Sequence, residues 1–240
     1  MALDRLRSRP GRWRGGAATA ALAVCRAAIT RHAASGAPAA AALAVAVLGA
    51  LAACRHLPPN LDSPGTAIVC LGDSITAGVG ASPGHGWVDV LAARLGQPVV
   101  NAGVSGETAA EGLARLPQVL AEDPWLVIVE LGGNDILRQV PIESTEQALD
   151  EIVRRLLAAR VLPVLVAVSG PFGGRHAEIY DRVGDRYRVP VVRDVLRGIL
   201  RDPSLRSDEV HPNDLGHARL GEAVAATLEP LLRERRRRGR

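Results

Sequence analysis

The chain has 240 residues, of which 48% are hydrophobic, so it can build one substantial core and does not require a second domain. Its formal charge is +4, and all 29 basic residues are arginine. The excess of arginine lies at the two ends, because residues 55–232 carry 16 Arg against 23 Asp and Glu, a net charge of −7. The central part of the chain is therefore not basic, which argues against a nucleic-acid partner.

Residues 1–54 have the pattern of a membrane-directed leader. Seven scattered arginines precede an uninterrupted apolar run from Ala39 to Ala53. The run is shorter than the roughly 20 residues that span a bilayer, which favours a signal peptide over a permanent transmembrane helix. Its end, Leu51-Ala52-Ala53-Cys54, is similar to the lipobox of bacterial lipoproteins, which implies lipidation of Cys54. A non-lipidated signal peptide and an uncleaved Ala-rich helix are the alternative interpretations. All three interpretations place the domain outside the cytoplasm, in the periplasm or cell envelope.

Residues 55–65 are rich in turn-forming residues and are predicted to be a linker, followed by a domain over 66–232. Short apolar runs in that domain alternate with longer amphipathic segments, which predicts buried strands and helices in turn. The predicted strands are 66–71, 99–101, 126–131, 163–168 and 189–192, and the predicted helices are 87–95, 109–121, 145–159, 177–184 and 215–232.

The alternation indicates an α/β fold with a parallel sheet covered on both faces, in which ligands bind beyond the carboxyl ends of the strands. Cys70 is the only cysteine of the domain, so no internal disulfide is expected and Cys70 is interpreted as a small core residue. The arginine-rich tail 233–240 is interpreted as a solvated, frayed helix end, although contact with anionic lipid or nucleic acid is an alternative.

Four polar segments follow predicted strands or precede the last helix. Ser74 comes directly after the first strand, in Gly72-Asp73-Ser74, where a serine by itself is more often a helix N-cap than a nucleophile. Asp208 and His211 lie three residues apart, so that the carboxylate can orient an imidazole that activates a serine. Surface polarity near a helix start is the alternative interpretation of that pair.

Acyl transfer also needs hydrogen-bond donors for the developing oxyanion. The glycine-rich turn around Gly106 and the segment Gly132-Gly133-Asn134 can supply them, and each is otherwise an ordinary turn. The other histidines, His85, His176 and His217, have no comparable partner and are predicted to be surface or loop residues. No metal-ligand spacing or phosphate-binding glycine motif is present in the sequence, so no metal or cofactor is implied.

In their order along the chain, these segments resemble the sequence blocks of SGNH (GDSL) hydrolases over residues 66–228. The serine, glycine, asparagine and histidine after which the SGNH blocks are named fall at Ser74, Gly106, Asn134 and His211. Residues 101–117 and 129–135 look most similar to the bacterial arylesterase, thioesterase and lysophospholipase branch. The nucleophile elbow Gly-x-Ser-x-Gly of α/β-hydrolases is absent, because Thr76 occupies the second glycine position.

The resemblance implies a flavodoxin-like α/β/α sandwich with a five-stranded parallel sheet. It also implies that Ser74 is the nucleophile, that His211 is the base oriented by Asp208, and that the oxyanion hole consists of the N–H of Ser74, the N–H of Gly106 and the side chain of Asn134. The predicted function is therefore hydrolysis of small-molecule esters or thioesters. A carbohydrate deacetylase of the same superfamily and a non-catalytic envelope binding protein are the alternatives. The glycine-rich segment 169–175 departs from the family pattern and leaves the acyl-chain preference open, and the sequence does not indicate an oligomeric state.

Overall fold

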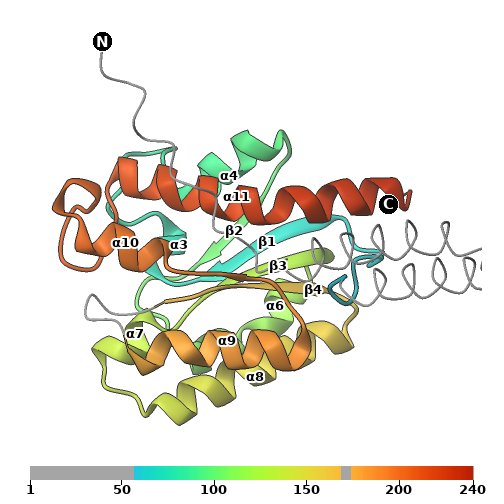
Figure 1. The fold of residues 1–240 in the computed structure, drawn as a ribbon, viewed down its shortest axis with the longest axis horizontal. Coiled ribbons are helices and arrows are strands. Elements are labelled where there is room, and N and C mark those ends of the chain that lie inside the picture. Colours follow the sequence, from blue (N-terminus) through green and yellow to red (C-terminus); the bar gives the residue numbers. More distant parts are fainter. Residues whose placement is uncertain (1–56, 169–173, 240) are drawn as a thin grey trace, which may run out of the picture. The chain divides into compact units, whose positions relative to one another are not determined.

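The computed structural model describes residues 57–168 and 174–239, and the chain from Pro58 onwards forms one compact unit. A single sheet of five parallel strands runs through this unit in the order β2-β1-β3-β4-β5 (Figure 1). The predicted parallel sheet is therefore confirmed. The strands are β1 (Ala67–Gly72), β2 (Val100–Gly103), β3 (Pro124–Glu130), β4 (Leu162–Val166) and β5 (Val191–Val192).

Helices cover both faces of the sheet, as predicted. In Figure 1, α4 and α11 pack together on one side of the strands while α8 and α9 lie on the other. The α-helices of the described residues are α3 (Ser74–Ala77), α4 (Trp87–Leu95), α5 (Ala109–Ala114), α6 (Leu116–Leu120), α7 (Gly133–Leu137), α8 (Ile142–Ala158), α9 (Arg175–Tyr187), α10 (Val195–Arg201) and α11 (Asp214–Arg237), with a 3-10 turn, η1, at Pro203–Leu205.

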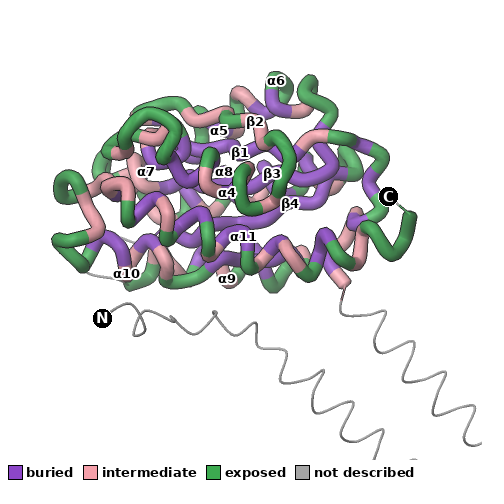
Figure 2. The backbone as a smooth tube through the Cα atoms, turned by 90° about the horizontal axis from the view of Figure 1, so that it is seen from above, coloured by how far each residue is buried: buried purple, intermediate pink, exposed green. Residues whose placement is uncertain are grey.

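The core lies on the two faces of the central strands. Every residue of β3 is buried, and the side chains of Val69, Cys70 and Leu71 in β1 have no exposed surface. Figure 2 shows the same pattern, with buried backbone through the strands and exposed residues on the outer helix faces. Continuous apolar strands of this kind are expected where helices cover both faces of a parallel sheet. Cys70 is the small core residue that the sequence predicts.

The strand order reverses at β1, and this reversal determines where a ligand can bind. The chain passes from β1 to β2 on one side and then crosses to β3 on the other side. Gly72, the last residue of β1, is in register with Gly103 of β2 and Glu130 of β3, so the three strands end at the same edge. The segments that follow them therefore meet at a topological switch point, which is the usual ligand crevice of a doubly wound sheet.

The structure divides one predicted helix and adds several short ones. Residues 109–121 form two helices, α5 and α6, because Pro117 has no N–H to continue the hydrogen bonding of α5 and is instead accommodated in the first turn of α6. The helices α3, α7 and α10 were not predicted, since segments of four to seven residues are too short to show a helical period.

The segment predicted to be a linker is packed against the domain from Asn60 onwards. The Asn60 side chain donates hydrogen bonds to two carbonyl groups beside the end of α8, and Leu61 and Ser63 are buried. The segment has no regular secondary structure, because its backbone N–H groups donate hydrogen bonds to a side chain and within a turn. The predicted leader, including Cys54, lies outside the described residues.

The first part of the arginine-rich tail is helical and belongs to α11. Helix α11 continues through Arg237, and the Arg235 guanidinium donates to the carbonyl oxygens of Leu61, Ser63 and Gly65. The same guanidinium lies 4.3 Å from the centre of the Trp125 ring, a cation–π arrangement. One arginine of the tail thus ties the start of the domain to its last helix, while Arg236, Arg237 and Arg238 are exposed.

Candidate active site

Ser74 is the first residue of α3, directly after the carboxyl end of β1. The helix N-cap is Asp73 and not Ser74, because the Asp73 carboxylate accepts a hydrogen bond from the Ile75 N–H at 3.0 Å. The Ser74 hydroxyl is therefore available for another partner. It lies 2.9 Å from Nε2 of His211.

His211 and Asp208 lie on the loop before α11, and the structure brings both to Ser74. Oδ2 of Asp208 lies 2.8 Å from Nδ1 of His211, on the opposite side of the ring from the serine. The other carboxylate oxygen accepts hydrogen bonds from the N–H groups of Val210 and His211, both at 2.8 Å. Asp208 therefore closes the turn and orients the imidazole at the same time. The N-cap of the following helix, α11, is Asn213, whose side chain accepts hydrogen bonds from the N–H groups of Leu215 and Gly216.

Burial acts to raise the pKa of Asp208, but its hydrogen bonds with the Val210 and His211 N–H groups and with the His211 ring outweigh that effect. The pKa of Asp208 consequently lies below its usual value. Asp208 is thus ionised at neutral pH, which is the state that accepts a hydrogen bond from Nδ1–H.

Gly106 and Asn134 come from the segments after β2 and β3. The Asn134 amide nitrogen is 3.1 Å from Oδ2 of Asp73 and 3.0 Å from the carbonyl oxygen of Glu107, the neighbours of Ser74 and Gly106 in the chain. This one side chain therefore joins all three segments. The backbone N–H groups of Ser74 and Gly106 have no hydrogen-bond partner within the part of the chain that the structure describes. They are available as donors to a ligand.

Two glycines are required by this geometry. Gly106 has a φ of +84°, a conformation that costs little only for glycine, and its carbonyl oxygen accepts from the Arg138 guanidinium at 2.6 Å. Gly132 has a φ of +117°, and a Cβ atom there would lie 2.2 Å from the hydroxyl oxygen of Tyr180. The turn that carries Asn134 can thus form only with glycine at position 132.

Comparison with known proteins assigns this arrangement to a family. The GDSL-like lipase/acylhydrolase family profile matches residues 70–219, more than half of the chain. The chain is 37% identical to esterase TesA of Pseudomonas aeruginosa over 178 residues, which are 69% of this chain and 89% of TesA. It is 34% identical to thioesterase 1/protease 1/lysophospholipase L1 of Escherichia coli K12 over 175 residues, 69% of this chain and 84% of that protein. The crystal structure of TesA superposes with a TM-score of 0.64 at 36% identity and covers 69% of this chain and 99% of the TesA chain.

The chain belongs to the GDSL-like lipase/acylhydrolase family. The predicted family, the α/β fold and hydrolase activity are thereby confirmed.

Two buried carboxyl groups lie beneath the site of this GDSL hydrolase and were not singled out from the sequence. Burial raises the pKa of Asp73 to about 6, although its hydrogen bond with Ile75 opposes the shift. Glu130, the last residue of β3, is fully buried, and burial followed by the charge of Asp73 raises its pKa well above the usual value. An acidic residue at the end of an otherwise apolar strand is the sequence signal that could have identified Glu130.

The prediction that His217 is a surface or loop residue is wrong. His217 lies in α11 with no exposed surface, accepts at Nδ1 from the Trp87 N–H at 3.2 Å and bonds through Nε2 to the Val79 carbonyl at 3.0 Å. Burial lowers its pKa, so the neutral ring that makes both bonds is favoured. A helical period places His217 on the buried face of α11 with Leu220 and Val224, which is the signal that was missed. His85 lies in an exposed loop and His176 on the partly exposed first turn of α9.

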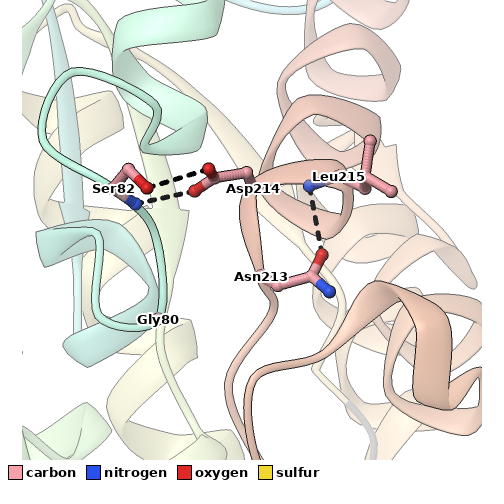
Figure 3. Close-up of a pocket in the computed structure, with 5 residues that line it drawn as sticks. All are labelled: Gly80, Ser82, Asn213, Asp214 and Leu215. Atoms are coloured by element: carbon pink, nitrogen blue, oxygen red, sulfur yellow. Dashed lines mark hydrogen bonds between the residues drawn. The ribbon is translucent and has the colours of Figure 1, made fainter.

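A shallow pocket beside the His211 loop is lined by Gly80, Ser82, Asn213, Asp214 and Leu215 (Figure 3). The backbone N–H and the hydroxyl of Ser82 both donate to the Asp214 carboxylate, at 2.6 and 2.9 Å. These bonds tie the loop after α3 to the start of α11. Neither Ser74 nor His211 lines the pocket, so it is distinct from the site described above.

Within residues 57–168 and 174–239, no group of three or more His, Cys, Asp or Glu side chains has the arrangement of a metal site. No helix in this part of the chain is both long and apolar enough to cross a membrane.

Proposed function

We propose that this GDSL hydrolase cleaves carboxylic esters or thioesters through an acyl-enzyme on Ser74. The observation that carries the proposal is the hydrogen-bonded series from Ser74 Oγ through His211 to Asp208, with distances of 2.9 and 2.8 Å. A serine hydroxyl is a weak nucleophile until a base accepts its proton, and the base needs a partner that fixes its tautomer.

The reaction follows from this arrangement. Nε2 of His211 takes the Ser74 proton as Oγ bonds to the acyl carbon, and the carbonyl oxygen becomes an oxyanion. Collapse of the tetrahedral intermediate expels the alcohol or thiol, which receives the proton from His211. Water then attacks the acyl-enzyme with His211 again as base, and release of the acid restores Ser74.

The N–H groups of Ser74 and Gly106 and the amide of Asn134 stabilise the oxyanion in this proposal. Without substrate, both Asn134 contacts are made within the protein, to Asp73 and to Glu107. To donate to the oxyanion, the Asn134 amide must therefore share or give up one of these two hydrogen bonds. The backbone N–H groups of Ser74 and Gly106 have no existing bond within the described residues to give up.

The acyl group is proposed to be apolar. Large hydrophobic side chains are exposed in the segments that carry the site residues: Val104 is 44% exposed two residues before Gly106, and Leu137 is 60% exposed three residues after Asn134. Val79, five residues after Ser74, is 39% exposed. Such residues favour an acyl or aryl group over the polar ring that a carbohydrate deacetylase would bind. The names of the relatives, an esterase and a thioesterase/protease/lysophospholipase, support the same substrate class.

Labelling with a fluorophosphonate is the direct test. We expect one molecule of probe per chain, on the peptide that contains Ser74, and hydrolysis of p-nitrophenyl esters and acyl thioesters that stops in proportion to labelling. Ser74→Ala should be neither labelled nor active. Labelling at another serine, or turnover that continues after complete labelling, would contradict the acyl-enzyme. Turnover of acetylated sugars without turnover of acyl esters would favour the deacetylase, and no turnover of any ester would favour a binding protein.

We further propose that residues 1–54 direct export and that Cys54 is lipidated, on the basis of the apolar run followed by Leu51-Ala52-Ala53-Cys54. Expressed in a bacterial host with lipoprotein processing, the full chain is expected to partition into detergent and to carry a diacylglyceryl group at Cys54. Cys54→Ala should abolish both properties, whereas Cys25→Ala should leave them unchanged. A product that keeps residues 1–54, or an unlipidated one, would refute the anchor.

A further inference from the structure

Glu130 is a buried acid with too few hydrogen-bond partners for a carboxylate. Its side chain has no exposed surface, and Oε2 accepts one hydrogen bond, from the Thr76 hydroxyl at 2.8 Å. Its other oxygen, Oε1, has no partner within the described residues at strict hydrogen-bond geometry. An ionised carboxylate in this position would lose most of its hydration without compensation, whereas a carboxylic acid would not.

Asp73, whose carboxyl group interacts with that of Glu130, links two parts of the site. It is 2% exposed, and its two oxygens accept from the Ile75 N–H at 3.0 Å and from the Asn134 amide at 3.1 Å. The first bond fixes the start of the helix that carries Ser74, and the second fixes the side chain of Asn134. A small displacement of Asp73 would therefore move both groups.

Two carboxyl groups that share a buried site do not both ionise, because each negative charge opposes the other. Asp73 accepts hydrogen bonds from Ile75 and Asn134, while Glu130, which is fully buried, accepts one from the Thr76 hydroxyl and has a weaker interaction with the backbone N–H of Asp73. The negative charge is thus better stabilised on Asp73, and the proton resides on Glu130. As an acceptor, Oε1 of Glu130 has no partner in the part of the chain that the structure describes. When Glu130 is protonated, its O–H group can instead donate a hydrogen bond toward Asp73.

The other titratable groups around the pair do not change this assignment. Cys70 of β1 and Tyr180 of α9 are buried beside Glu130, and burial raises the pKa of each, so both are neutral. Asp135 of α7 adds a further acidic group, and the His211 ring acts favourably on Asp73. These neighbours therefore favour the ionised form on Asp73 and not on Glu130.

We propose that Glu130 is a positioning residue of the hydrolytic reaction, a protonated carboxylic acid that accepts from Thr76, donates to Asp73 and thereby holds Ser74 and Asn134 in place. The inference rests on the proposed function, because it concerns the groups that are assigned there as nucleophile and oxyanion donor. The proposal predicts that kcat depends on the shape and the hydrogen-bond pattern of the Glu130 side chain and does not depend on a negative charge there.

Two substitutions separate donor pattern from charge. Glu130→Gln keeps one acceptor for Thr76 and one donor for Asp73, so we expect kcat for a p-nitrophenyl ester within about threefold of wild type. Glu130→Leu keeps the volume but removes both bonds, so we expect kcat to fall by about 10- to 100-fold with KM within about twofold. Glu146→Gln, which removes an acid paired with Arg182 outside the site, is the control and should not change kcat.

The pH dependence of stability gives a readout that packing alone would not change. The pKa of Glu130 is higher in the folded chain than its ordinary value of 4.5, so the folded state binds the proton more tightly. The contribution of Glu130 to stability should therefore decrease as the pH rises above 4.5 toward the folded pKa. Gln has no such proton, and the Tm of Glu130→Gln relative to wild type should increase between pH 5 and pH 8.

A Gln variant as inactive as the Leu variant would show that the charge of Glu130 is needed, and would overturn the proposal. So would a Leu variant with wild-type kcat, or a Tm difference that does not change with pH. If the Leu variant does not fold, Thr76→Val tests the same link, with an expected loss of about tenfold in kcat and an overturning result of no loss. Ser74→Ala tests the proposed function separately, since activity in that variant would refute the acyl-enzyme whatever the Glu130 variants do.

Discussion

Ser74→Ala and His211→Ala are each expected to reduce kcat for ester hydrolysis by about 10⁵-fold or more, and the double variant is expected to be no slower than either. Nucleophile and base act as a unit, because the hydroxyl is unreactive without the base and the base has no proton to take without the hydroxyl. The 2.9 Å contact between Ser74 Oγ and His211 Nε2 is the structural reason for this dependence. Steady-state kinetics on one aryl ester, with single-turnover measurements for the slow variants, would establish the three rates.

Two matched substitutions control for the loss of a serine and of a histidine. Ser144 is exposed on α8 and His85 is exposed in the loop before α4, so Ser144→Ala and His85→Ala should keep wild-type kcat. Multiplicative losses in the double variant would mean that Ser74 and His211 act independently, which is inconsistent with a shared proton transfer.

Asn134→Ala is expected to reduce kcat by about 10²- to 10³-fold, equivalent to about 2.7–4 kcal/mol of transition-state stabilisation, with little change in KM. The negative charge that Asn134 stabilises exists only after Ser74 has attacked, so the loss should fall on the chemical step. The measurement is kcat and KM on the same ester, together with near-UV circular dichroism. Unaltered tertiary signals are needed because Asn134 also bonds to Asp73 and Glu107.

Asn60→Ala is the control for Asn134, since the Asn60 amide also donates to two partners, the carbonyl oxygens of Leu157 and Val161. It should lower Tm and leave kcat unchanged, because these bonds hold the start of the domain and lie outside the site. An Asn134 variant that raises KM without lowering kcat would indicate that Asn134 binds substrate in the ground state and does not stabilise the oxyanion.

The central strands and the family could be predicted from the sequence because both depend on local patterns. Apolar runs such as 126–131 are long enough to be identified as buried strands, because a strand that is covered on both faces accommodates few polar residues. The polar segments directly after those strands could be grouped at one edge of a parallel sheet without knowledge of any contact. By contrast, the break between α5 and α6 and the short helices α3 and α7 depend on single residues and on capping, where periodicity is not informative.

For the individual site residues, the sequence determined the types and the order, and the tertiary structure decided the partners. Ser74 by itself was compatible with an N-cap, and the structure resolves that ambiguity because Asp73 caps α3 while Ser74 Oγ meets His211, 137 positions later in the chain. The roles of His217 and Glu130 could not be inferred locally, since burial depends on which helix or strand packs above a residue. A carboxyl or imidazole group carries no mark of burial in the sequence, and its protonation is determined by hydration and neighbouring charge, which exist only once the chain has folded.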